Sequence, residues 1–78
     1  MRIDYRQLGK LVRQARRDAR LNQSELAVKL GLSRNYVSMI ERAEVNNLSV
    51  EVFCWLAEFI GVRPAELMGA IERGAGEN

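Results

Sequence analysis

The sequence predicts an all-α fold in which five helices form one compact domain. Two observations support this prediction. In five successive segments the apolar residues recur every three or four positions, as they do along one face of a helix. Residues that begin or end helices separate these segments, and no segment alternates between apolar and polar residues as a half-buried strand does. We expect residues 1–73 to form the domain and the glycine-rich residues 74–78 to be disordered.

The first two helices have clear boundaries in the sequence. Asp4 is a suitable N-cap for the first helix, whose apolar stripe reaches Ala15 beside a run of arginines. Asn22 is the expected N-cap of a second helix over about residues 23–30. Gly31 then ends that helix, because glycine adopts the left-handed conformation of a C-cap without steric cost.

The remaining helices are marked in the same way. A third helix is expected over about residues 33–42, a fourth over residues 49–61, and a fifth from residue 64 to about residue 73. Serine stands at the start of the third and of the fourth helix as an N-cap, and proline suits the first turn of the fifth. Residues 43–48 are expected to form a loop between the third and fourth helices.

Residues 22–41 predict a helix-turn-helix. One apolar face runs through the second and third helices, and the glycine–serine turn between them is short. Once that face is buried, the third helix is left with a mostly polar face that points outward. Its members are Arg34, Asn35, Ser38, Met39 and Arg42.

The composition excludes several kinds of chemistry. The 78 residues contain one cysteine, Cys54, and no histidine. A disulfide framework, the common zinc sites and histidine-dependent catalysis are therefore excluded. The carboxylates are scattered over helix surfaces, so we expect no enzyme activity, no metal and no cofactor. With no second domain we expect no small-molecule ligand, and the lack of a signal peptide or membrane span predicts a cytoplasmic protein.

Charge is divided unequally along the chain. Residues 1–42 hold ten basic and four acidic residues, a net charge of +6, whereas residues 43–78 hold two basic and six acidic residues, a net charge of −4. The basic half contains the predicted helix-turn-helix, as binding to a polyanion requires. The alternative interpretation is an ordinary mixture of charges on solvated helix surfaces.

Four segments together resemble a known family. They are LNQSELA at residues 21–27, GLS at 31–33, YVSMIER at 36–42 and LAEFIGVRPAEL at 56–67. In this order and spacing they resemble the Cro/repressor-type (XRE) helix-turn-helix regulators, from about residue 8 to about residue 67. The resemblance implies a lambda-repressor-like domain that binds double-stranded DNA. The small size and the segment RNYVSMIER also resemble restriction–modification controller proteins.

The start of the third helix carries the expected base contacts. Arg34 matches the hydrogen-bonding edge of guanine and Asn35 that of adenine in the major groove. Ser38 lies on the same face and is short enough for a base or a phosphate contact. Met39 is a weaker candidate, either against a thymine methyl group or as packing against the fourth helix.

Phosphate contacts are expected around these residues. The resemblance implies that Gln23 contacts the DNA backbone at the start of the second helix. Tyr36 either reaches a phosphate or packs under the loop. Arg42 is expected to contact the backbone, and Asn46 and Asn47 either do so or only form the turn.

The resemblance also implies a structural ion pair and two departures from the family pattern. Arg16 and Glu41 match positions that the family often joins between the first and third helices, so Glu41 should contact no DNA. Arg20 stands where a glycine or another residue that tolerates the left-handed conformation is common. Glu44 lies in a loop that is more often basic.

The fourth helix is apolar on two faces. One face is enough to cover the domain core, and the other contains Val52, Trp55 and Phe59. A homodimer would bury this second face, with Val62, Leu67, Met68 and Ile71 as further contributors. The alternative is that the fifth helix folds back and covers it within one chain.

Two functions from different classes follow. The leading prediction is a homodimeric, sequence-specific transcription regulator that binds a palindromic operator, as an autoregulatory controller or a phage-type repressor. RNA polymerase is a further candidate partner. The alternative is an antitoxin whose apolar surface neutralises a toxin and whose DNA binding is secondary.

Overall fold

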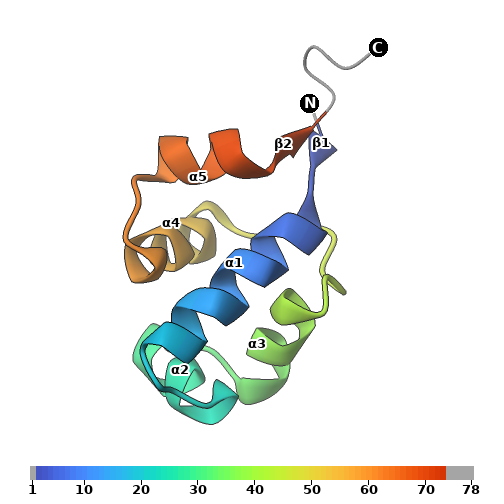
Figure 1. The fold of residues 1–78 in the computed structure, drawn as a ribbon. Coiled ribbons are helices and arrows are strands. Elements are labelled where there is room, and N and C mark those ends of the chain that lie inside the picture. Colours follow the sequence, from blue (N-terminus) through green and yellow to red (C-terminus); the bar gives the residue numbers. More distant parts are fainter. Residues whose placement is uncertain (1, 74–78) are drawn as a thin grey trace.

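Five helices and one pair of short strands make up the computed structural model, which describes residues 2–73 (Figure 1). The helices are α1 (Tyr5–Asp18), α2 (Gln23–Leu30), α3 (Arg34–Glu41), α4 (Val50–Ile60) and α5 (Pro64–Ile71), and the strands are β1 (Arg2–Ile3) and β2 (Glu72–Arg73). The all-α class predicted from the sequence is confirmed. The disorder predicted for residues 74–78 lies outside the described residues.

Local hydrogen bonds set the ends of the helices. Asn22 and Glu25 form a reciprocal capping box, in which the side chain of each accepts the backbone N–H of the other at 2.7 and 2.8 Å. Gly31 ends α2 with φ of +71°, the left-handed value expected for it. The Ser33 hydroxyl then accepts the backbone N–H of Tyr36 at 3.0 Å and starts α3.

The strand pair was not predicted. Arg2 pairs with Arg73 and Ile3 with Glu72 in antiparallel register. The fifth helix therefore ends at Ile71 rather than near Arg73, because Glu72 is extended (φ −73°, ψ 137°). Two residues per strand are too few to show an alternating pattern, so the sequence carries no signal for this pair.

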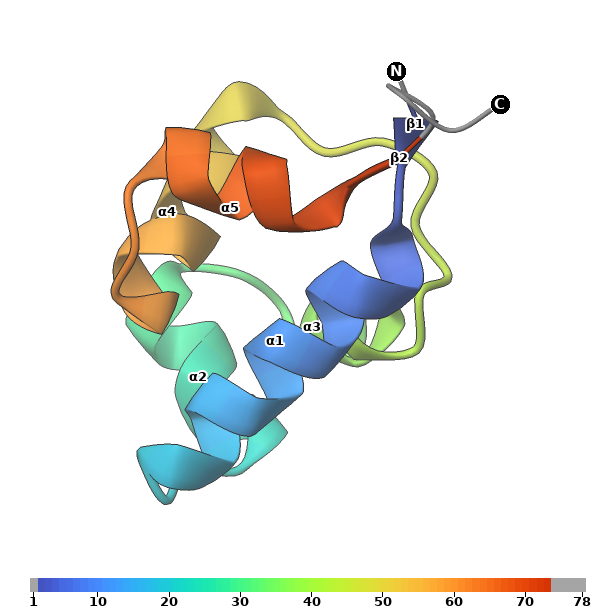
Figure 2. The same cartoon turned by 45° about the horizontal axis from the view of Figure 1, so that its top comes forward.

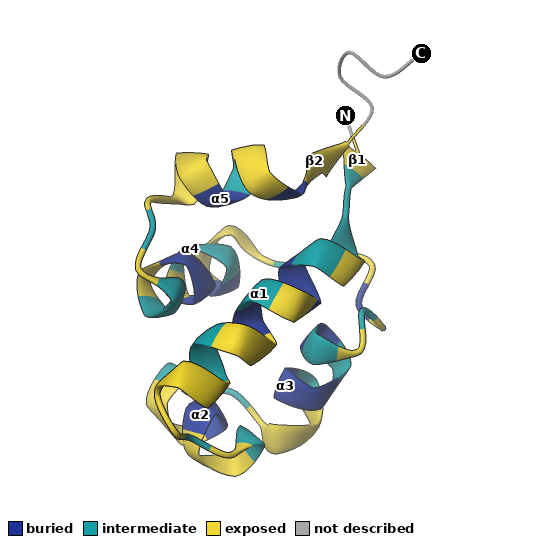
Figure 3. Ribbon diagram, in the orientation of Figure 1, coloured by how far each residue is buried: buried dark blue, intermediate teal, exposed yellow. Residues whose placement is uncertain are grey.

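α1 is the central element of the core. α2 and α3 pack against each other, α3 packs on α1, and α4 and α5 pack against each other and on α1. The loop after α3 runs along the molecule to α4 (Figure 2). Buried residues face inward from all five helices (Figure 3), and the largest fully buried side chains are Leu8, Val12, Leu26, Val37, Ile40, Leu56, Leu67 and Ile71.

Two turns place residues other than glycine in the left-handed region. Arg20 has φ of +60° and Ala43 has φ of +58°. Arg20 takes the left-handed conformation that the resemblance to the family implied for this position. Nothing in the sequence indicated the same conformation for Ala43. The first turn follows α1 and leads into the helix-turn-helix, and the second follows α3, the last helix of that motif.

Gly9 allows α1 and α3 to approach closely. A Cβ atom at this position would lie 2.7 Å from the backbone oxygen of Glu41 and 2.8 Å from that of Ile40. Real Cβ atoms do not come this close to backbone oxygens, so any larger residue would push the end of α3 away from α1. Gly9 therefore fixes the distance between these two helices.

Gly9→Ala should lower the free energy of unfolding by about 1–3 kcal/mol, because the backbone oxygens that it meets have little room to move. The matched control is Gly69→Ala in α5, where an added Cβ would meet nothing within 4 Å. That variant should be stabilised by up to about 1 kcal/mol, as expected for glycine to alanine inside a helix. Urea unfolding of both variants measures the difference, and equal behaviour would contradict the close contact.

Candidate nucleic-acid interface

α2 and α3 form the helix-turn-helix. Residues 31–33 join them, and the left-handed Gly31 lets the chain reverse over this short distance. Leu26 of α2 and Val37 and Ile40 of α3 are buried in the shared core. Because Val37 and Ile40 face the core, the opposite side of α3 faces outward.

Arg16, Gln23 and Glu41 join three helices through one carboxylate. Arg16 donates to Glu41 from Nε to Oε2 at 2.6 Å and from Nη2 to Oε1 at 3.0 Å. Gln23 donates from Nε2 to Glu41 Oε1 at 3.1 Å. The ion pair expected between Arg16 and Glu41 is thus present, and Gln23 adds α2 to it.

Glu41 is held in its charged form. Burial raises the pKa of its carboxyl group, whose side chain is 1% exposed. Hydrogen bonds from Arg16 and Gln23, with the positive charges of Arg16 and Arg13, outweigh burial, so the pKa lies below its ordinary value. The hydrogen bond to Glu41 also raises the pKa of Arg16. The negative charge of Glu41 is therefore neutralised inside the domain.

The first turn of α3 presents the two expected base-reading residues to solvent. Arg34 and Asn35 are both exposed. Asn35 Nδ2 lies 3.7 Å from the sulfur of Met39, which is half-buried and packs against the core. Arg34 and Asn35 are therefore free to meet a base edge, whereas Met39 is mainly a packing residue.

Ser38 does not belong to the outward face. Its residue surface is 7% exposed, and its hydroxyl accepts a hydrogen bond from Arg42 Nη1 at 2.6 Å. The prediction that Ser38 points outward is wrong, because the Arg42 side chain folds back over it. Arg42 also donates from Nη2 to Glu44 Oε1 at 2.8 Å, and this hydrogen bond raises the pKa of Arg42.

The other predicted DNA contacts lie in different surroundings. Tyr36 is half-buried and packs against the core, in agreement with the second of its two interpretations. Asn46 and Asn47 are exposed in the loop after α3. Gln23 is half-buried at the start of α2, with its amide nitrogen used by Glu41.

A polar hollow brings the starts of α2 and α3 together. It is lined by Arg16, Asn22, Gln23, Ser24 and Arg34. The first N–H groups of a helix have no partner within it, so the start of α2 offers donors of the kind that a phosphate requires. The sequence prediction included Gln23 and Arg34 but omitted Ser24, whose position in the first turn of α2 was the available signal.

The seven residues predicted for a dimer interface do not share one surface. Val52, Leu67 and Ile71 are buried in the core of the single chain. Assigning these three to a partner is wrong, because α5 folds back on α4 and α1 with Leu67 and Ile71 in the core, and Val52 of α4 belongs to the same core. Val62 is half-buried and packs against the same core.

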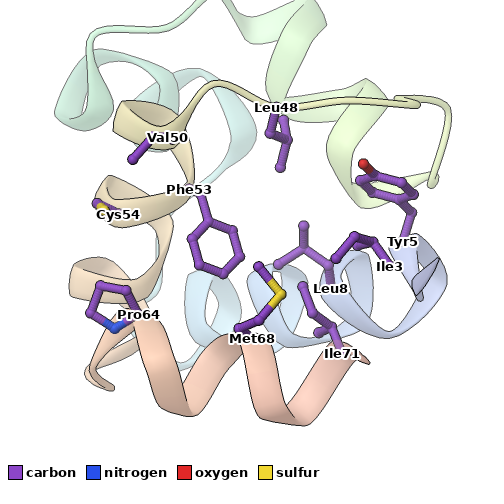
Figure 4. A pocket seen from close by; sticks show the side chains of 10 residues that line it. All are labelled: Ile3, Tyr5, Leu8, Leu48, Val50, Phe53, Cys54, Pro64, Met68 and Ile71. Carbon is purple, nitrogen blue, oxygen red and sulfur yellow. The ribbon is translucent and has the colours of Figure 1, made fainter. Parts of the chain in front are cut away.

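Met68 lies in a separate apolar pocket. This pocket has a volume of about 300 Å³ and lies between α1, α4 and α5 (Figure 4). Met68 and Phe53 point into it, and Cys54 lies on its α4 wall. Trp55 does not line it, so Met68 and Trp55 belong to different surfaces.

Trp55 and Phe59 form one accessible apolar surface of α4, separate from Val50, which is 78% exposed at the start of the helix. Trp55 is 41% exposed and Phe59 is half-buried. They border two shallow hollows with residues from the end of α2. We call this the Trp55 surface, and its members are Val28, Lys29, Leu30, Trp55, Glu58 and Phe59.

A comparison with protein families agrees with this geometry. The family model HTH_3, described as Helix-turn-helix, matches residues 12–67, which is more than half of the chain. The chain belongs to this helix-turn-helix family. As an HTH_3 protein it is a regulator of transcription that binds double-stranded DNA. A comparison with curated proteins returns no match.

Within residues 2–73, no helix combines the length and apolar character needed to cross a bilayer. The same range contains no group of three or more histidine, cysteine or carboxylate side chains placed to hold a metal ion. The structure places the polar hollow beside the exposed first turn of α3.

Glu41→Gln should lower the free energy of unfolding by about 3 kcal/mol at neutral pH, because it leaves the largely buried Arg16 without its anion. The folded-state pKa of Glu41 is lowered, so the unfolded chain takes up this proton first as the pH falls. The stabilisation is complete above the unfolded-state pKa of about 4.3 and is lost as the pH falls through the folded-state pKa.

Urea unfolding of the wild type and of Glu41→Gln, from neutral pH down through the folded-state pKa of Glu41, measures the difference in their free energies of unfolding. The difference between them should be constant at neutral pH and should shrink in the acid range. Glu51→Gln, at an exposed position of α4, is the matched control and should cost no more than about 0.5 kcal/mol. A difference that stays constant at acid pH would contradict the role of the Glu41 charge.

Proposed function

We propose that this HTH_3 protein is a sequence-specific regulator that binds a palindromic operator as a homodimer. The observation that carries the proposal is the exposure of Arg34 and Asn35 on the first turn of α3, beside the polar hollow at the start of α2. In the helix-turn-helix docking geometry, the first turn of the second helix of the motif, here α3, meets the bases. The adjoining N-terminus of α2 then meets the DNA backbone.

Base recognition rests on the chemistry of these two side chains. An arginine can donate two hydrogen bonds to guanine O6 and N7, and an asparagine can pair with adenine N6 and N7. Phosphate contacts from the polar hollow would position the helix without reading sequence. Gln23 fits the role of a phosphate contact that positions the helix, because the hydrogen bond of its amide to Glu41 holds it in place.

The Trp55 surface supports the homodimer. It combines an exposed aromatic side chain with Val28, which is 83% exposed. It also carries one base, Lys29, and one acid, Glu58. In a two-fold interface the same patch meets itself, so Lys29 of each copy can face Glu58 of the other. Two copies would place two α3 helices about one DNA turn apart, roughly 34–36 Å.

Autoregulation follows from this arrangement. In a chain of this size, dimerisation and operator occupancy would both depend on the concentration of the protein itself. We propose that it controls its own gene in this way, as a restriction–modification controller or a phage-type repressor. RNA polymerase is then the partner through which a bound dimer would act. An antitoxin role is the second candidate, in which the Trp55 surface would meet a toxin rather than another copy.

Arg34→Ala should weaken binding to a duplex that carries the operator by about 1–3 kcal/mol and should leave binding to a random-sequence duplex nearly unchanged. Arg17→Ala on α1 removes the same charge from an exposed position outside the polar hollow and serves as the control. Fluorescence anisotropy with both duplexes measures the four affinities. Equal losses on the two duplexes would make Arg34 a phosphate contact instead.

Lys29→Glu and Glu58→Lys should each raise the dimer dissociation constant by about tenfold, because each places like charges face to face at two points of the interface. In an equimolar mixture the two variants should form a heterodimer with a dissociation constant close to that of the wild type, since their charges are complementary. Sedimentation analysis measures these states. A mixture that remains monomeric would rule out this pairing, and a monomeric wild type would favour the antitoxin role.

A further inference from the structure

Arg42, the phosphate contact expected at the end of α3, already binds an anion from its own chain. Its Nη2 donates to Glu44 Oε1 at 2.8 Å, and its Nη1 donates to Ser38 Oγ at 2.6 Å. Each of the two Nη groups therefore already donates one hydrogen bond within the chain. A phosphate that pairs with this fork through Nη2 has to compete with Glu44.

The turn after α3 holds Glu44 in place. Ala43 takes the left-handed conformation, with φ of +58°. The backbone N–H of Glu44 donates to the carbonyl of Met39 at 2.8 Å, and that of Ala43 to the carbonyl of Ile40 at 3.1 Å. These two bonds close the end of the helix and direct the chain back beside Arg42. The backbone of this turn therefore places Glu44 within reach of Arg42.

The pair is accessible to DNA. The side chains of Arg42 and Glu44 are 53% and 52% exposed. An exposed pair of this kind is weak and can be exchanged for another anion. Arg16, by contrast, is largely buried with its carboxylate partner. Of these two arginines, only Arg42 can change its partner without opening the core.

We propose that Glu44 is an intramolecular competitor for DNA phosphate, which occupies Arg42 in the free protein and lowers the affinity for DNA of any sequence. The proposal rests on the proposed role of α3 as the helix that enters the major groove. Phosphate contacts carry no sequence information, so Glu44 changes affinity and salt dependence and leaves base preference unchanged. It limits the electrostatic attraction that the basic half of the chain would otherwise have for all DNA.

Glu44→Gln tests the proposal, with Glu51→Gln as the matched control. Glu51 is an exposed glutamate on the first turn of α4, so both substitutions change the net charge equally. Glu44→Gln should raise the affinity for a random-sequence duplex about two- to fivefold. It should also make the slope of log K against log salt steeper by about 0.9, as one additional phosphate contact does. Glu51→Gln should leave the slope unchanged.

A double-mutant cycle with Arg42→Ala shows whether Glu44 changes the affinity for DNA through Arg42. In the Arg42→Ala background, Glu44→Gln should have no larger effect than Glu51→Gln. An equal gain with and without Arg42 would mean that Glu44 acts only through general repulsion and would overturn the inference. If the wild type binds DNA but Glu44→Gln matches Glu51→Gln, this inference alone fails. If the wild type binds no DNA, the proposed function fails with it.

Discussion

The buried carboxylate of Glu41 is the contact on which the position of α3 depends. It accepts two hydrogen bonds from Arg16 of α1 and one from Gln23 of α2, and it lies at the last residue of α3. A buried charge is tolerated only when its partners satisfy it, so these three side chains must keep one arrangement. Gly9 adds a second constraint, because it brings α1 against the backbone of the same turn. The orientation and the distance of α3 are thus set by different residues of α1.

This arrangement separates the two tasks of a short helix. α3 has eight residues. The core and the carboxylate junction use its C-terminal half, and the first turn is left to Arg34 and Asn35. The buried charge of Glu41 is neutralised by Arg16, so it does not repel phosphate. Glu44 is an exposed acid just after the helix, beside Arg42. The same short segment therefore combines an attraction for DNA with a limit on it.

Features that depend on neighbouring residues in the chain could be predicted from the sequence. Gly31, Ser33 and Asn22 mark helix ends because each acts on backbone groups a few residues away. The exposure of Arg34 and Asn35 was predictable for the same reason, since helical spacing decides which residues share a face.

Among the features that depend on distant contacts, the resemblance to the family implied the Arg16–Glu41 ion pair, and the others could not be predicted. Gly9 is surrounded by an ordinary helical pattern, and only the approach of α3 gives it a role. Ser38 and Arg42 have the i,i+4 spacing that allows their contact, but the burial of Ser38 depends on how α3 packs on the core. The path of α5 decides whether Leu67 and Ile71 meet a partner or the core, and it is a property of the whole fold.

Selection from a pool of randomised duplex DNA, on the purified protein at near-physiological salt, tests the central claim most directly. The account predicts enrichment of a palindrome whose half-sites lie about one helical turn apart, because two α3 helices read it at once. Guanine and adenine should occur at the positions that Arg34 and Asn35 contact. Enrichment of no sequence, with weak binding that disappears as salt rises, would mean that only charge attracts the protein to DNA and would contradict the account.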